Sequence, residues 1–323
     1  VLERSALPFE QRLSPTTRKY LEFYEESIKD PEKFWDNEAR KLEWFRMWNK
    51  VLEWDPPFAR WFVGGLLNAS YLCLDRHVKN WRRSKVAIYW EDEFGNAKTW
   101  SYSQLYSEVN RFASVLQRLR VEKGARVAVY LPLIPELPIT MLASARLGAI
   151  HTVVFSGFSA YALADRVDDT QAKVLVTADG SFRRGNLIPL KKTVDVALEK
   201  CPSIESVVVV KRANIEVPMK EGRDFWYHEL LQSGRDFVEP LPVEANDPLY
   251  ILYTSGTTGK PKGIVHNTGG YMVFNHSAYK WAFDIRDESV YWCTADIGWV
   301  TGHSSIVYAP LAHAATMVLY EGA

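Results

Sequence analysis

The chain reads Tyr253-Thr254-Ser255-Gly256-Thr257-Thr258-Gly259-Lys260-Pro261-Lys262-Gly263 directly after an apolar strand predicted over residues 249–253. Glycines in such a loop let backbone N–H groups approach an anion closely, and the hydroxyl side chains add further donors. Lys260 and Lys262 supply positive charge. The loop therefore predicts a polyphosphate-binding site at the end of a strand.

Other interpretations of this loop explain less of the sequence. A P-loop of the G-x-x-x-x-G-K-[ST] type needs glycine at position 254 and serine or threonine at position 261, where this chain has Thr254 and Pro261. A solvated Gly/Thr hairpin would explain only some of these residues. A nucleotide-dependent dehydrogenase is also disfavoured, because no G-x-G-x-x-G follows a predicted strand.

The composition indicates a globular chain without an overall charge. Its 323 residues are 47% hydrophobic, and 39 Lys and Arg balance 39 Asp and Glu. A net charge of zero attracts neither nucleic acid nor an anionic membrane. Cys73, Cys201 and Cys293 lie far apart, which favours a reducing compartment and predicts a cytoplasmic protein. No apolar run is long enough to predict a membrane span.

The pattern changes along the chain and predicts three segments. Residues 1–85 are rich in tryptophan and charge, which predicts helices and turns packed over a larger body. Residues 86–246 are predicted to form a first α/β subdomain, and the polar stretch 211–248 is predicted as loop that leads to its boundary. Residues 247–323 begin a second α/β subdomain with the strand that precedes the phosphate loop.

Short apolar strands alternate with helices from residue 86 onward. A hairpin turns at Gly95-Asn96, and Ser103 is predicted to cap the helix that follows it. Further strands are predicted at 126–131, 151–155, 173–177 and 206–210, and helices at 135–147, 160–170 and 190–200. This alternation predicts an α/β fold with a doubly wound, mostly parallel sheet.

Several separated segments carry a resemblance to a known family. They are Trp61-Phe62-Val63-Gly64-Gly65, Cys73-Leu74-Asp75-Arg76-His77, Val153-Val154-Phe155-Ser156-Gly157-Phe158-Ser159 with Ala162-Leu163-Ala164-Asp165-Arg166, Arg183-Arg184-Gly185, and the run from Tyr291 to His303. Together with the phosphate loop they resemble the adenylate-forming superfamily, and within it the AMP-forming acetyl-CoA synthetases. The resemblance covers essentially the whole chain but only about the first half of the family's usual length.

The resemblance implies an enzyme of small molecules. Family members activate acetate with ATP and Mg²⁺ to acetyl-adenylate and pyrophosphate, and CoA then displaces AMP to give acetyl-CoA. The implied fold is the family's N-terminal domain, with no nucleic-acid or membrane partner. The implied ATP phosphate-binding residues are Thr254, Ser255, Gly256, Thr257, Thr258, Gly259, Lys260 and Lys262, among which Thr254 and Lys260 would act in catalysis.

The resemblance also implies where acetate and CoA bind. Trp299, Val300 and Thr301 match the family's acetate pocket, and His303 close by is interpreted as a structural hydrogen-bonding residue. The implied CoA-binding residues are Phe155, Gly157, Arg183 and Arg184. Asn186 stands where the family often has a second basic residue, so a contact from Arg184 in its place stays open.

The sequence stops before several motifs of the family. These are the adenine and ribose motifs, the glutamate associated with Mg²⁺, the second tryptophan of the acetate pocket, and the C-terminal domain with its catalytic lysine. We therefore expect an N-terminal fragment with little or no complete activity, and we predict no metal ligand in it. Two alternatives stay open: a synthetase for propionate or another short-chain acid, and a non-catalytic nucleotide-binding module. The sequence predicts no oligomeric state.

Overall fold

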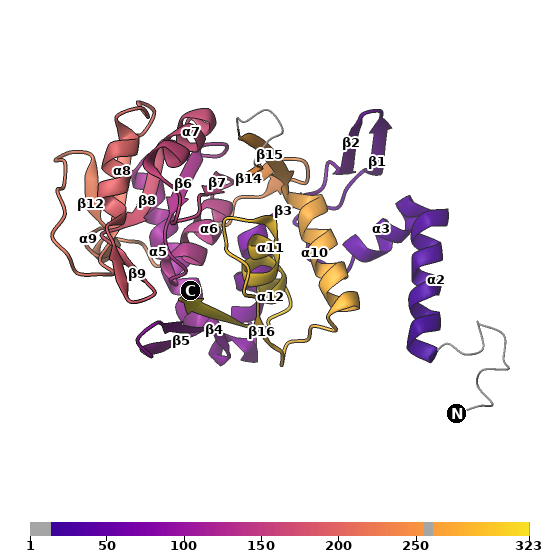
Figure 1. Cartoon of the computed structure of the whole chain (residues 1–323). Helices are drawn as coiled ribbons and strands as arrows, with labels where there is room; N and C mark the ends of the chain where they lie inside the picture. Colours follow the sequence, from indigo (N-terminus) through magenta and orange to yellow (C-terminus); the bar gives the residue numbers. More distant parts are fainter. Residues whose placement is uncertain (1–13, 255–260, 323) are drawn as a thin grey trace.

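The computed structural model describes residues 14–254 and 261–322, and its largest sheet has seven strands (Figure 1). Their order is β12 (Asp224–Trp226), β11 (Ser206–Val210), β8 (Val174–Ala178), β6 (Arg126–Tyr130), β7 (Ile150–Val153), β14 (Pro248–Thr254) and β15 (Lys262–Asn267). Neighbouring strands are parallel except for the antiparallel pair β14 and β15. β8 and β11 are buried along their whole length, as expected for central parallel strands covered on both faces.

Helices flank this sheet in two groups. α5 (Tyr102–Arg118) packs against α6 (Glu136–Arg146) and α9 (Tyr227–Gln232), whereas α7 (Ala160–Thr170) packs against α8 (Leu190–Leu198). The apolar residues that recur at helical spacing in α5 are buried, because they face the sheet and the neighbouring helices. The predicted α/β fold with a doubly wound, mostly parallel sheet is confirmed.

Two local details differ from the sequence prediction. The N-cap of α5 is Ser101 and not Ser103, because Ser101 and Gln104 form a reciprocal capping box. The Gln104 N–H donates to Ser101 Oγ (3.2 Å), and the Ser101 N–H donates to Gln104 Oε1 (2.8 Å). Residues 211–248, predicted as loop, contain β12, α9 and β13 (Val243–Glu244), which are too short to give a clear periodic pattern.

A second sheet has four strands. Their order is β16 (Val290–Trp292), β17 (Thr316–Glu321), β4 (Val86–Asp92) and β5 (Ala97–Ser101). β17 is parallel to both β16 and β4, and β4 and β5 form the predicted hairpin. Both sheets thus contain strands from either side of residue 247, and the division into subdomains at that residue stays a prediction.

The N-terminal part of the chain lies at one end of the molecule, beside α10 (Thr268–Ala282) (Figure 1). It contains α2 (Pro15–Lys29), α3 (Pro31–Ala39), the hairpin β1 (Lys50–Asp55) and β2 (Phe58–Val63), and β3 (Leu66–Leu67), which pairs with β13. Its aromatic residues pack together: the Trp48 ring centre lies 4.9 Å from that of Trp44 and 5.1 Å from that of Phe62. These contacts lie within the segment, whereas Trp35 reaches α10, since its ring centre lies 6.4 Å from those of Phe274 and Trp281.

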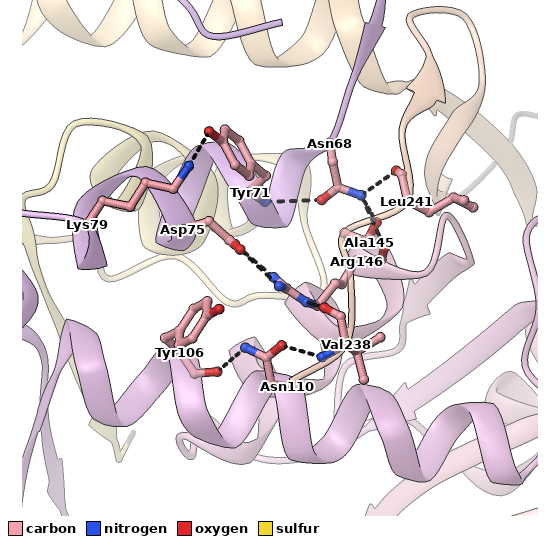
Figure 2. A network of polar contacts seen from close by, with 10 residues as sticks. All are labelled: Asn68, Tyr71, Asp75, Lys79, Tyr106, Asn110, Ala145, Arg146, Val238 and Leu241. Atoms are coloured by element: carbon pink, nitrogen blue, oxygen red, sulfur yellow. Dashed lines mark hydrogen bonds and ion pairs between the residues drawn. The ribbon is translucent and has the colours of Figure 1, made fainter. Parts of the chain in front are cut away.

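A buried ion pair fixes this segment to α6 (Figure 2). Asp75 ends a π-helical turn (Tyr71–Asp75), which α4 (Arg76–Val78) and a 3₁₀-helix (Trp81–Ser84) follow. Arg146 Nη1 and Nη2 donate to the two oxygens of Asp75 at 2.8 and 2.9 Å, and Arg146 Nε donates to the Val238 carbonyl at 2.6 Å. Asn68 Nδ2 donates to the carbonyl oxygens of Ala145 and Leu241, both at 2.9 Å. The network therefore joins three stretches that are distant in sequence.

Within the described residues, none of the helices combines the length and the apolar character that crossing a membrane requires.

Candidate functional site

The predicted phosphate loop begins where β14 ends. Thr254 is the last residue of β14, and its register partner is Lys262, the first residue of β15. Both side chains are exposed. The loop residues Ser255, Gly256, Thr257, Thr258, Gly259 and Lys260 lie outside the described residues, so their predicted phosphate contacts stay predictions. The position of the loop, between two antiparallel strands at the carboxyl end of β14, is the place where open α/β sheets bind ligands.

A cavity of about 460 Å³ lies against this strand end, and we call it the loop cavity. Thr254 lines it together with Trp299 and Val300, two of the three residues predicted for the acetate pocket. Thr301 is exposed and is not part of the lining. The remaining lining residues are Val153, Val154, Phe155, Phe158, Arg166, Leu252, Tyr253, Ile264, His266 and Gly298.

Arg166 is a residue of the loop cavity to which the sequence assigned no role. Its guanidinium carbon lies 4.7 Å from the centre of the Phe158 ring and 5.5 Å from that of Tyr253, and Nη1 donates to the Ala162 carbonyl at 2.6 Å. Burial lowers the pKa of Arg166. It is the one Lys or Arg among the described lining residues, so it is the fixed positive charge there. Only its place in a segment of the resemblance could have indicated it.

A second cavity of about 580 Å³ lies beside the hairpin β9 (Ser181–Arg183) and β10 (Asn186–Ile188), and we call it the hairpin cavity. Phe155, Gly157 and Arg183, three of the four residues predicted for CoA, line it together. The fourth, Arg184, does not: its backbone N–H donates to Glu93 Oε1 at 2.7 Å.

The two cavities share a wall. Phe155 and Trp299 line both, and their ring centres are 5.6 Å apart. The Arg183 guanidinium carbon lies 5.3 Å from the centre of the Phe155 ring. A Cβ on Gly157 would stand 2.5 Å from Phe155 Cε1, so a side chain there would have to displace the ring. The side chains of Phe155 and Trp299 would therefore border molecules in both cavities.

His303 contacts the backbone of Trp299, one of the two residues of this shared wall. It begins the π-helix His303–Tyr308 that follows α11 (Val300–Gly302). The backbone N–H of His303 donates to the Trp299 carbonyl at 3.1 Å, and Nδ1 lies 3.3 Å from the same oxygen. Burial lowers the pKa of His303 to about 4, which keeps the imidazole neutral. Its ring stacks on His151, with centres 5.6 Å apart.

Two carboxyl groups line the hairpin cavity, the buried Glu321 and the half-buried Asp296, and the sequence prediction missed both. Asp296 Oδ1 accepts the Gly298 N–H at 2.7 Å, and burial raises the pKa of this carboxyl group. Glu321 receives the Arg212 Nε–H on both oxygens, at 3.0 and 2.8 Å, and burial raises its pKa to about 7. The two residues form no spacing motif, because Asp296 lies in the connection after β16 and Glu321 ends β17, and they line one cavity only in the folded chain.

Metal-ligating side chains do not cluster in the part of the chain that the structure describes. No group of three or more His, Cys, Asp or Glu residues there could hold a metal ion.

A run of glycine, hydroxyl and lysine residues that follows a strand end beside the loop cavity is typical of nucleotide-dependent enzymes, and the comparison with known families identifies the family. The model of the AMP-binding enzyme family matches residues 74–323, and the chain belongs to this family. A second model, of the acetyl-coenzyme A synthetase N-terminus, matches residues 20–73.

Similar proteins within this family share a more specific name, acetyl-coenzyme A synthetase. The chain is 54% identical over 316 residues to the acetyl-coenzyme A synthetase of Pyrobaculum arsenaticum, a match that covers 94% of this chain and 47% of that protein. It is 57% identical over 300 residues to the acetyl-coenzyme A synthetase of Rubrobacter xylanophilus, covering 93% and 47%. The resemblance inferred from the sequence is therefore confirmed. The chain spans about half the length of these relatives.

A solved structure supports the fold. The acetoacetyl-CoA synthetase of Streptomyces lividans superimposes with a TM-score of 0.85 at 27% identity, over 92% of this chain and 45% of that one. The predicted fold, that of an adenylate-forming N-terminal domain, is confirmed by this likeness and by the family model.

Proposed function

We propose that this chain carries the substrate sites of an AMP-forming acetate–CoA ligase. The enzyme converts acetate and ATP to acetyl-adenylate and pyrophosphate, and then transfers the acetyl group to CoA to give acetyl-CoA and AMP. The observation that carries the proposal is the high identity to two acetyl-coenzyme A synthetases over more than nine-tenths of this chain. The adjoining cavities with a shared aromatic wall support it, because the two half-reactions need the acyl group and CoA side by side.

The phosphate loop would hold ATP. Thr254, the residues from Ser255 to Lys260, and Lys262 would donate to the phosphates, with Thr254 and Lys260 closest to the reacting group. Acetate is a poor electrophile, and joining it to the α-phosphate gives it a good leaving group. Backbone N–H donors and lysine charge offset the negative charge that develops on the phosphates. Mg²⁺ would arrive with ATP as part of the substrate.

Each cavity would bind one substrate, the loop cavity the acyl group and the hairpin cavity CoA. Trp299 and Val300 would provide apolar walls for the acetyl group in the loop cavity, with Thr301 as a donor at its edge. Phe155 and Gly157 would line the path of the pantetheine arm, since a missing Cβ permits close approach. Arg183 would bind CoA phosphate with its guanidinium group, and Arg184 would assist from the turn.

We also propose that the reaction takes place in the cytoplasm. Cys73, Cys201 and Cys293 are all free thiols, and Cys73 and Cys201 are buried. Unpaired cysteines are typical of a reducing compartment.

A hybrid protein tests the proposal. Residues 1–323 are joined to the part of the Rubrobacter xylanophilus relative that lies beyond the matched region, and acetate-dependent ATP–pyrophosphate exchange and acetyl-CoA formation are measured. We expect both activities in the hybrid and neither in its Lys260→Ala variant. Binding of ATP to residues 1–323 alone, by calorimetry, provides a second readout.

Assays of the hybrid with other acids decide between acetate, another short-chain acid and a non-catalytic module. A hybrid that is silent with acetate but active with propionate, butyrate or acetoacetate would reject acetate and retain the ligase. A hybrid that binds ATP but activates none of these acids would favour a non-catalytic nucleotide-binding module.

A further inference from the structure

We propose that Asp296 is a catalytic residue of the transfer step: its carboxylate accepts the proton of the CoA thiol as the sulfur attacks the acetyl group. This inference rests on the proposed function, and it assigns a task to a residue of the hairpin cavity that neither the sequence motifs nor the phosphate loop accounts for.

The position of Asp296 is the first argument. It lies in the connection between β16 and α11, three residues before Trp299, and it lines the hairpin cavity with Gly157 and Arg183. Asp296 Oδ1 and the backbone nitrogen of Phe155 each lie 3.1 Å from the point where a Cβ on Gly298 would stand. The carboxyl group is therefore beside the wall through which an acyl group in the loop cavity and a thiol in the hairpin cavity would meet.

The orientation of the carboxyl group is the second argument. Oδ1 is held by the Gly298 N–H at 2.7 Å, whereas Oδ2 has no hydrogen-bond partner among the described residues. One oxygen thus fixes the side chain, and the other is available to a ligand. A general base needs this combination of a fixed position and a free lone pair.

The other carboxyl group of the cavity is less suitable. Asp296 and Glu321 are the two acidic residues in the described lining, and both oxygens of Glu321 accept from Arg212 Nε. Protonation of Glu321 would break its ion pair with Arg212, so this carboxylate is a less suitable proton acceptor. Arg183 is the one Lys or Arg in the described lining, and its charge partly offsets the rise that burial causes in the pKa of Asp296; the other titratable groups of that lining are Cys293, Tyr320 and Glu321.

The chemistry requires a proton acceptor. A thiol with a pKa of about 8.5 is only a few per cent thiolate at neutral pH, and the thiolate is the nucleophile. In the proposed step the S–H proton moves to Asp296 Oδ2 and the sulfur forms a bond to the acetyl carbonyl carbon. The bond from that carbon to the phosphate oxygen breaks, and its electron pair leaves with AMP. The carboxylic acid then returns the proton to solvent. Burial assists, because it makes this carboxylate a stronger base than an exposed one.

The test uses D296N in the hybrid protein, with two readouts. Asparagine keeps an Oδ1 that can accept the Gly298 N–H, but its amide cannot take a proton. We expect acetate-dependent ATP–pyrophosphate exchange to stay within about twofold. We expect transfer from preformed acetyl-adenylate to CoA, in a single turnover, to fall by about 10²- to 10³-fold, within the usual range for loss of a general base.

The pH dependence separates a proton acceptor from a structural residue. In the unsubstituted hybrid the transfer rate should level off above the pKa of Asp296. In D296N it should continue to rise with pH through the range of the thiol, about 8.5, because only preformed thiolate then reacts. D296E, which retains a carboxylate, should transfer faster than D296N. D236N, the same change at an exposed aspartate that lines neither cavity, is the matched control and should leave both steps unchanged.

Three results would overturn the inference. Transfer in D296N at the rate of the unsubstituted hybrid would remove Asp296 from the reaction. An equal fall of exchange and transfer in D296N would make the residue structural. A selective loss of transfer in E321Q but not in D296N would assign the proton to Glu321. Absence of exchange in the unsubstituted hybrid is a different failure, since it rejects the proposed function itself.

Discussion

Removing the charge of Asp75 should destabilise the fold strongly, because its partner Arg146 would stay buried without a counter-ion. We expect D75N to lower the free energy of unfolding by about 3–5 kcal/mol, the usual cost of leaving one member of a buried ion pair without its partner. Arg146 is 0% exposed and Asp75 is 5% exposed, so water cannot replace the lost carboxylate. Asparagine can accept with only one oxygen, and its amide group would direct N–H donors at the guanidinium group, which has only donors.

Urea and thermal unfolding of residues 1–323 measure this effect. For a chain of 323 residues, each kcal/mol corresponds to about 1.5 °C in Tm, so D75N should melt several degrees lower. E25Q is the matched control, because the Glu25–Lys29 pair is exposed and its loss should cost at most about 1 kcal/mol. The double variant D75L/R146M, which buries no charge, should recover much of the loss.

Two results would refute this reasoning. A D75N variant within 1 kcal/mol of the unsubstituted chain, within the usual range for an exposed pair, would mean that water reaches Arg146. Strictly additive effects of D75L and R146M would mean that the two charges do not interact in the folded chain.

Three further predictions concern pH, the shared cavity wall and helix capping. Lowering the pH from 7 to 4 should reduce the free energy of unfolding. Burial lowers the pKa values of His77 and His276 to about 3 and those of His303 and His313 to about 4. Below the ordinary histidine pKa of about 6.5 the unfolded chain therefore binds more protons than the folded chain, which favours unfolding. Urea titrations at several pH values should show a smaller slope in H276Q/H313Q, and an unchanged slope would contradict these assignments. In the hybrid, G157A should raise the KM for CoA by roughly 10-fold or more while exchange is retained, because the new Cβ displaces the Phe155 ring; an unchanged KM would separate Gly157 from CoA. S101A should cost about 1 kcal/mol in urea unfolding through loss of the capping box, whereas S103A should cost less, and the reverse order would restore Ser103 as the cap.

The elements that the sequence predicts well are those with a strong local pattern. The strand Ser206–Val210 contains four consecutive valines, as a strand buried on both faces requires, and α5 repeats its apolar residues at helical spacing. The pairing of β17 with β4 has no such signal, because it depends on packing between distant parts of the chain. Short elements such as β12 fail for a different reason: three residues do not establish a period.

The candidate site divides in the same way. The phosphate loop is recognisable because its glycines, hydroxyls and lysines are consecutive in sequence, and Phe155, Gly157 and Trp299 are recognisable because they lie in segments of the resemblance. Asp296 and Arg166 lie in those segments too. Their assignment depends on the cavities that they line, which form only in the folded chain and cannot be read from the sequence.

The parallel pairing of β17 with β4 also sets an order of events during folding, since more than 200 residues separate the two strands. At a synthesis rate of about 5–20 residues per second, β4 would leave the ribosome about 11–45 s before β17. During that interval one edge of β4 has no neighbour, and an unpaired strand edge is prone to association with other chains. Closing so long a loop is also slow. The smaller sheet should therefore complete its hydrogen bonding late, and newly made chains should depend on chaperones until β17 docks.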